Sequence, residues 1–146
     1  MEWNIVPYVG MGPIKFGMNP DEVSEILGAP KRVRTSGNSL RESRGLEMPI
    51  IRYKDNKVTQ IEVFYDVKNV TLGDVNIFGD DGLQVMQTLE TKNGGAKIDV
   101  GITIFENLGI TAGRLDEDVP GEHSITAFCK GYWDNDMEDF TDISFQ

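Results

Sequence analysis

Hydrophobic and polar positions along the chain follow one pattern twice. Residues 12–30 (GPIKFGMNPDEVSEILGAP) have a fainter copy in residues 73–90 (GDVNIFGDDGLQVMQTLE). The copies align at a shift of 61, as in Gly12 and Gly73, and after one inserted residue at a shift of 62, as in Val23 and Val85. The pattern predicts an α+β fold with two similar halves in a single domain, residues 1–146. Each half, about 1–68 and 69–146, is expected to pack a short helix on an antiparallel sheet.

Residues 19–28 carry the strongest helix signal in the chain. Asn19 is a favourable N-cap, Pro20 suits the first helical position, and Glu22 completes a capping box. Gly28 is a favoured residue for ending a helix, and Pro30 cannot continue one. The spacing predicts an apolar stripe facing the sheet, made of Val23, Ile26 and Leu27.

Strand patterns follow this helix in the first half. Residues 31–36 favour a short strand, whereas residues 37–47 are rich in turn-forming types and predict a mobile loop. Strands are expected at 49–53 and 58–65, joined by a turn at Asp55-Asn56. Alternation in the second of them places Ile61, Val63 and Tyr65 on one face.

The second half repeats the plan with weaker signals. Asp80 or Asp81 is the expected cap of a helix over residues 81–91, ended by Gly94-Gly95. Its apolar positions are Val85, Met86 and Leu89. Alternating isoleucines and valine predict one strand over residues 98–104, followed by strands at 108–114 and 124–130. Apolar residues in the tail predict a short closing strand: Phe140, Ile143 and Phe145.

Charge is unevenly distributed over the chain. Residues 31–44 hold five basic residues and one acidic residue, whereas residues 115–146 hold nine acidic residues and one lysine. The last 32 residues therefore contribute −8 of the net charge of −10. Such a surface repels nucleic acid and attracts basic partners. The basic segment is interpreted as a solvated loop that pairs with the acidic tail.

Sites for catalysis, metals and cofactors are not assembled in the sequence. The one histidine, His123, adjoins Ser124 and is too close in sequence to orient it as a triad requires. Two acidic loops lack the ligand pattern of a calcium-binding loop. Because Cys129 is the single cysteine, internal disulfides and multi-cysteine zinc sites are excluded, and buried filler is its simplest role. We therefore expect no catalytic residues, no metal and no cofactor.

Location is also bounded by composition. The N-terminus, MEWNIVPYVGMG, lacks the basic and apolar regions of a signal peptide, and no window approaches the apolar length of a membrane span. These features predict a cytoplasmic protein without a membrane partner.

A family resemblance adds to this interpretation. The segment GPIKFGMNPDEVSEILGAP, the strand entry Phe105-Glu106-Asn107-Leu108-Gly109-Ile110 and the ending Gly131-Tyr132-Trp133-Asp134 resemble small bacterial immunity-type proteins. Those proteins are associated with polymorphic or contact-dependent toxin systems. The resemblance implies a chain that binds and neutralises a cognate toxin domain and catalyses nothing itself. No functional residue carries over, because the matching positions are folding determinants.

The candidate binding residues come instead from charge and aromatic content. A basic toxin domain is the expected partner, and it would contact the acidic C-terminal third. Aromatic anchors and steering charges are predicted in one segment: Tyr132, Trp133, Asp134, Asp136, Glu138 and Asp139. Two alternatives stay open, a small ligand-binding or scaffolding module and a carboxylate-dependent enzyme.

Overall fold

A computed structural model of the chain describes residues 1–79 and 81–146, which form an α+β fold. The first half contains β1 (Trp3–Val6), β2 (Gly10–Met11), β3 (Ile14–Lys15), α1 (Pro20–Leu27), β4 (Arg32–Ser36), β5 (Ser39–Ser43), β6 (Ile50–Lys54) and β7 (Lys57–Phe64). The second half contains β8 (Val70–Leu72), β9 (Val75–Asn76), α2 (Gly82–Asn93), β10 (Ala96–Asp99), β11 (Ile102–Phe105), β12 (Ile110–Gly113), β13 (Ser124–Phe128) and β14 (Thr141–Ile143). Two short 3-10 helices lie at Pro120–Glu122 and Met137–Asp139.

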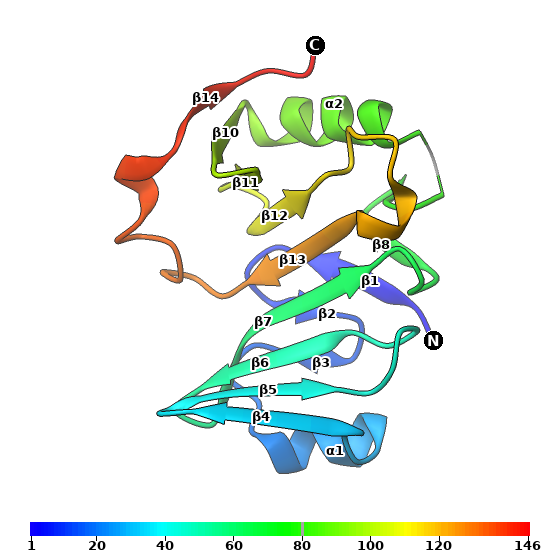
Figure 1. The fold of residues 1–146 in the computed structure, drawn as a ribbon, viewed down its shortest axis with the longest axis vertical. Helices are drawn as coiled ribbons and strands as arrows, with labels where there is room; N and C mark the ends of the chain where they lie inside the picture. The colour runs from blue at the N-terminus through cyan, green and yellow to red at the C-terminus, as the bar shows by residue number, and fades with distance from the viewer. Residues whose placement is uncertain (80) are drawn as a thin grey trace.

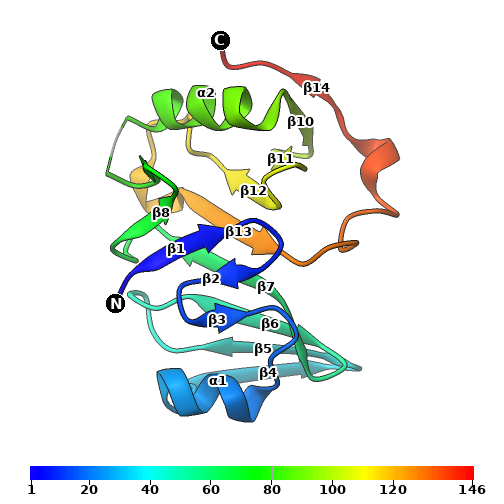
Figure 2. The same ribbon diagram turned by 180° about the vertical axis from the view of Figure 1, so that it is seen from behind.

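The strands form a large and a small sheet. The large sheet has nine strands in the order β14-β10-β11-β12-β13-β7-β6-β5-β4, all antiparallel, and the small sheet has the order β3-β2-β1-β8-β9. Viewed from behind, α1, the small sheet and α2 lie in front of the large sheet from one end to the other (Figures 1 and 2). One face of the large sheet is therefore covered by this second layer.

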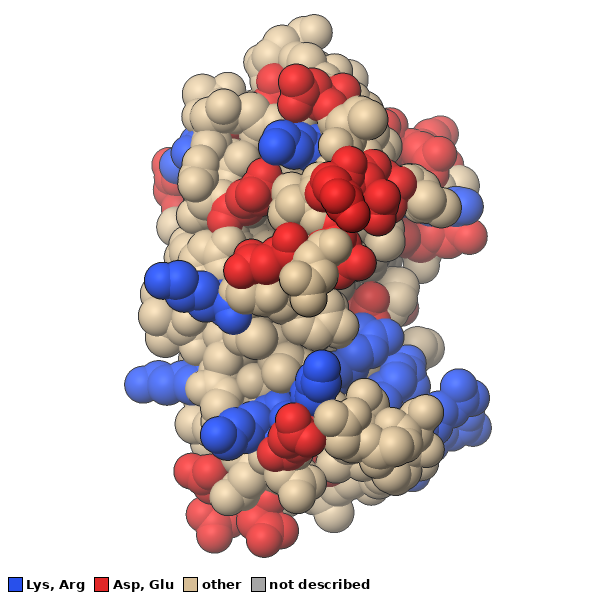
Figure 3. All heavy atoms as spheres, turned by 90° about the vertical axis from the view of Figure 1, so that its left-hand side faces the viewer, with Lys and Arg blue, Asp and Glu red and all other residues tan. Residues whose placement is uncertain are grey.

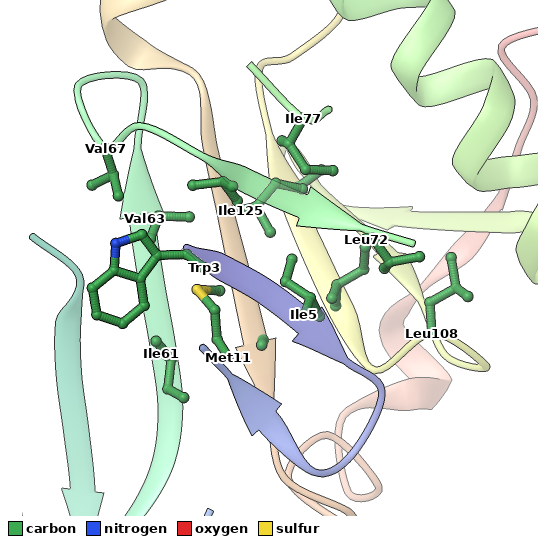
Figure 4. Packing of buried hydrophobic residues seen from close by; sticks show 14 of the residues in the cluster. Trp3, Ile5, Met11, Ile61, Val63, Val67, Leu72, Ile77, Leu108 and Ile125 are labelled. Atoms are coloured by element: carbon green, nitrogen blue, oxygen red, sulfur yellow. The ribbon is translucent and has the colours of Figure 1, made fainter. Parts of the chain in front are cut away.

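The core fills the space between the two layers. Trp3, Ile5 and Met11 from the small sheet point toward Ile61 and Ile125 of the large sheet (Figure 4). All of these side chains are almost fully buried. Burial of this apolar surface is the main favourable contribution to folding.

Each half presents its elements in the same order. A small-sheet hairpin, β2-β3 or β8-β9, is followed by a helix and then by four consecutive strands of the large sheet. The two sets of four meet where β7 pairs antiparallel with β13, as in Val63 opposite Ile125. The predicted helix-on-sheet layout is confirmed. Superposition of the two halves as a structural repeat stays a prediction.

Both helices begin and end where their caps predict. Asn19 accepts a hydrogen bond from the Glu22 amide at 2.8 Å, and the Glu22 carboxylate accepts one from the Asn19 amide at 3.1 Å. Asp81 caps α2 by accepting from the Gln84 amide at 3.2 Å, and Gly94 ends the helix in the left-handed conformation. Asp80, the other proposed cap, lies outside the described residues.

The apolar stripe of α1 differs from the prediction, whereas that of α2 is confirmed. Val23 is fully buried, but Leu27 is only half-buried and Ile26 is 41% exposed. The reason is that α1 lies at the outer end of the large sheet, beside β4, where the sheet covers only part of its surface (Figure 2). In α2, the three predicted positions are buried: Val85, Met86 and Leu89.

Three predictions about strands are wrong. The expected loop at 37–47 contains β5, which pairs with β4 on one side and β6 on the other. The expected continuous strand at 98–104 is a hairpin, because Val100 and Gly101 adopt positive φ and turn the chain. Tyr65 follows the end of β7 and is exposed, so it does not share the buried face of Ile61 and Val63.

Candidate functional site

The C-terminal segment folds over the second face of the large sheet, opposite the core. Phe128 of β13 and Ile104 of β11 form a separate apolar cluster there with Phe140. Trp133 and Met137 pack against this cluster from the segment itself. β14 then pairs with β10 and closes the sheet edge, as the tail pattern predicts. The second face is thus covered in one half of the molecule by residues 129–140.

The two neighbouring aromatic residues of this segment lie in different surroundings. Trp133 is partly buried and stacks edge-to-face on Phe140, with ring centroids 5.7 Å apart. Tyr132 is 40% exposed and stacks edge-to-face on Trp133 at 5.6 Å. Trp133 therefore anchors the segment to the sheet, and Tyr132 presents its ring to solvent.

The predicted acidic residues lie on the surface just beyond this anchor. All four side chains are exposed, namely Asp134, Asp136, Glu138 and Asp139. None of them forms an ion pair with another described residue. We call residues 134–139 the acidic segment. Figure 3, which views the molecule from this side, shows carboxylates gathered mostly in the upper half.

A row of arginines crosses the uncovered part of the same sheet face. Arg34 of β4 lies opposite Arg41 of β5, and Arg41 lies opposite Arg52 of β6. Residues directly opposite each other on neighbouring strands share a face of the sheet. The row continues through Gln60 of β7 to Phe128, at the edge of the covered half. Basic side chains accordingly gather below the acidic ones in Figure 3.

These arginines line a groove that Tyr132 borders. The groove has a volume of about 270 Å³ and is lined by Arg34, Arg41, Arg52, Tyr132 and neighbouring residues of β4–β7. Burial raises the pKa of Tyr132 above its ordinary value of 10.0, and the positive charge of Arg52 partly offsets this rise. We call this feature the arginine groove. Tyr132 thus lies where the arginine groove and the acidic segment meet.

The sequence did not predict the arginine groove. The short strand predicted at residues 31–36 is present as β4, but the basic segment was also interpreted as a solvated loop that pairs with the acidic tail, whereas residues 39–43 form β5. No ion pair joins this segment to the tail among the described residues. The available signal was the arginine content at positions 34, 41 and 52, but the strand register that aligns these residues is not visible in sequence.

A second charged cluster has a structural role. Glu42 and Arg44 are buried under α1, where Glu42 accepts hydrogen bonds from the Tyr53 hydroxyl at 2.6 Å and from Arg44 at 3.2 Å. Arg44 also donates to the Gly28 carbonyl at 2.9 Å and the Ser24 hydroxyl at 3.3 Å. These bonds join the C-terminal end of α1 to β5 and β6.

The remaining groups considered for chemistry are the acidic side chains, His123 and Cys129. No group of three or more His, Cys, Asp and Glu side chains is placed to hold a metal in this part of the chain. The His123 ring bonds the Glu117 carbonyl at 2.7 Å rather than Ser124. Burial raises the pKa of the Cys129 thiol, which disfavours the reactive thiolate. No helix in the described ranges is long and apolar enough to cross a membrane.

Comparisons with known proteins establish similarity of fold alone. No protein-family model matches the chain, and no curated protein matches its sequence. A solved structure of similar fold is the crystal structure of a cysteine-rich secretory protein from Staphylococcus aureus subsp. aureus Mu50. The two share 11% sequence identity with a TM-score of 0.51, and the match covers 100% of this chain and 56% of the other. This chain therefore spans about half the length of that protein.

Proposed function

We propose that this chain is an immunity-type protein that binds and neutralises a cognate bacterial toxin domain. Binding occurs through the side of the molecule that carries the acidic segment and Tyr132. The observation that carries the proposal is the position of Tyr132, exposed between free carboxylates on one side and arginines on the other. Tyrosine and arginine are enriched among the residues that dominate binding energy at protein interfaces.

The acidic segment supplies recognition of a basic partner. Its four carboxylates are exposed, and the anchor at Trp133 and Phe140 holds the adjoining chain against the sheet. Fixed, unpaired charges of one sign accelerate encounter with a partner of opposite sign. The resemblance to immunity-type proteins supports a toxin as this partner.

We expect a neighbouring gene to encode the cognate toxin domain, and association kinetics with that domain test the proposal. We expect the four amide substitutions of the acidic segment to slow association about tenfold at low salt, because steering is lost. A matched control replaces four exposed acidic residues elsewhere by their amides: Glu2, Glu25, Glu47 and Asp66. Both variants change the net charge equally, so only position distinguishes them.

Three outcomes of this experiment are decisive. A selective loss of rate in the acidic-segment variant supports the proposal. Equal rates in the two variants and the wild type would show that the acidic segment serves solubility only. A wild-type chain that does not bind the toxin domain would overturn the function itself.

A small ligand-binding module is the second candidate function, and the volume of the arginine groove bears on it. Ligand sites for drug-sized molecules and cofactors measure roughly 300–1,000 Å³. At about 270 Å³, the arginine groove lies below this range. Its size suits a side chain of a protein partner better than a cofactor.

A further inference from the structure

We infer that the arginine groove binds carboxylate side chains of the protein partner, presented by a short stretch of acidic residues on that partner. This inference deepens the proposed function and rests on it, since it assigns the partner a second, oppositely charged contact. Two sites on either side of Tyr132 would then bind the partner: the carboxylates of the acidic segment and the guanidinium groups of the arginine groove.

Three arginines in one cross-strand row are unfavourable for folding alone. Like charges directly opposite on neighbouring strands are destabilising. Arg52 is compensated by Glu62, whose carboxylate lies 3.0 Å from its guanidinium. Arg34 and Arg41 have no carboxylate partner among the described residues. Two adjacent guanidinium groups therefore remain available for an external anion.

The guanidinium groups match carboxylates in geometry as well as charge. Arginine forms two parallel hydrogen bonds with a carboxylate, and a planar guanidinium holds this fork in a fixed orientation. Ser36 and Ser39 line the same groove, and their hydroxyl groups can donate further hydrogen bonds. Arg41 and Arg52 are partly buried, which lowers the screening that weakens fully exposed ion pairs.

The charges around the groove favour binding of a short acidic stretch of a protein over binding of nucleic acid. The carboxylates of the acidic segment begin two residues after Tyr132, at the border of the groove. A long polyanion lying along this side of the molecule would meet these carboxylates and be repelled. A partner segment with one or two acidic side chains reaches the arginines and leaves its remaining surface free for the acidic segment.

A binding titration with a short oligoglutamate peptide tests the inference. The peptide is added to the isotopically labelled full chain at low salt, and shifts of the Arg34, Arg41 and Tyr132 signals are followed by NMR. The double variant Arg34→Gln and Arg41→Gln should weaken binding about fivefold or more, because two charge-assisted contacts are lost. Arg34→Lys with Arg41→Lys should weaken it less, since charge is kept while the planar fork is lost.

Arg32→Gln is the matched control. Arg32 lies on the same strand as Arg34, is exposed and has no place in the lining of the groove. Its substitution should change peptide affinity by less than about twofold, because it removes one exposed charge beside the groove but no contact with the peptide. An oligoglutamine peptide should give no shifts, which would exclude binding by the peptide backbone.

Several results would overturn the inference. These are no oligoglutamate binding, equal affinity of the Arg34 and Arg41 double variant and the wild type, or shifts produced by inorganic phosphate or oligothymidylate but not by oligoglutamate. Failure here is separable from failure of the proposed function. A chain that binds and neutralises the toxin but ignores oligoglutamate contradicts the groove alone, whereas oligoglutamate binding without toxin binding contradicts the function alone.

Discussion

The buried Glu42–Arg44 pair makes a strong prediction about stability. Glu42→Gln keeps the shape of the side chain but removes its charge. Glu42 is 4% exposed and Arg44 is 5% exposed, so the guanidinium would be left buried without a counter-charge. One buried nitrogen of Arg44 already has no hydrogen-bond partner among the described residues, so the side chain has little capacity to compensate.

The expected cost follows from this burial. Removing one partner of a buried ion pair destabilises a protein by about 3–5 kcal/mol. The total stability of a domain is roughly 5–15 kcal/mol, so the variant should be severely destabilised yet measurable. Part of the cost should arise from α1, because Arg44 donates to Gly28 and Ser24 at its C-terminal end.

Urea unfolding followed by tryptophan fluorescence measures this cost, since Trp3 lies in the core. Glu122→Gln is the control, because the same substitution there removes an exposed ion pair with Arg114 at 2.9 Å. Exposed pairs contribute about 0–1 kcal/mol. If Glu42→Gln lowered the free energy of unfolding no more than Glu122→Gln does, the cluster would not join α1 to the sheet as described.

Three further predictions concern stability. Val100→Asn should raise the free energy of unfolding by about 1 kcal/mol, because Val100 has φ 46° in a two-residue hairpin turn where asparagine is favoured; a decrease in thermal denaturation temperature would contradict this. Leu89→Ala should lower the free energy of unfolding by about 2–5 kcal/mol because Leu89 is fully buried, and Leu27→Ala should lower it clearly less because Leu27 is half-buried. Equal losses in denaturant titrations would show that the core is described incorrectly. Burial raises the pKa of the Tyr53 hydroxyl above 10.0, and the hydrogen bond to Glu42 raises it further. Above pH 10 the folded chain therefore keeps a proton that the unfolded chain releases, so the free energy of unfolding should fall as pH rises. Tyr53→Phe should remove up to about 1.4 kcal/mol per pH unit of this fall, and an unchanged slope in alkaline unfolding titrations would refute the assignment.

Local signals explain the parts of the fold that the sequence predicted. The caps at Asn19 and Asp81 are formed by residues three positions apart, so the sequence contains all of the information. The Asp55-Asn56 turn is equally local, and both residues adopt positive φ as a tight hairpin requires. Elements of this kind were placed correctly.

The errors at β5 and at the arginine groove have a different cause, which is pairing between strands, whereas the error at Val100 is a missed local turn. β5 has a turn-rich sequence, yet it lies between β4 and β6 and buries Glu42 against Tyr53. Alternation through Val100 continues across a turn, because residues on both sides of a tight hairpin keep the pattern of a strand. The arginine groove depends on the register of three strands, which sequence periodicity does not define.

The exposure of the candidate binding residues could be predicted in part. The acidic positions are exposed, as a charged run outside a strand or helix favours. Composition could not distinguish the roles of Tyr132 and Trp133, because only the fold shows that one contacts Phe140 and the other borders the arginine groove. Their contribution to partner binding stays a prediction.

Growth of bacterial cells that express the cognate toxin domain, which we expect a neighbouring gene to encode, is the decisive test of the proposed function. We predict that co-expression of the wild-type chain restores growth and that the two proteins copurify as a stoichiometric complex. We further predict that Tyr132→Ala, on a chain that remains folded, reduces both protection and complex formation. Toxin-inhibited growth in the presence of folded, wild-type chain, with no complex recovered, would contradict the account.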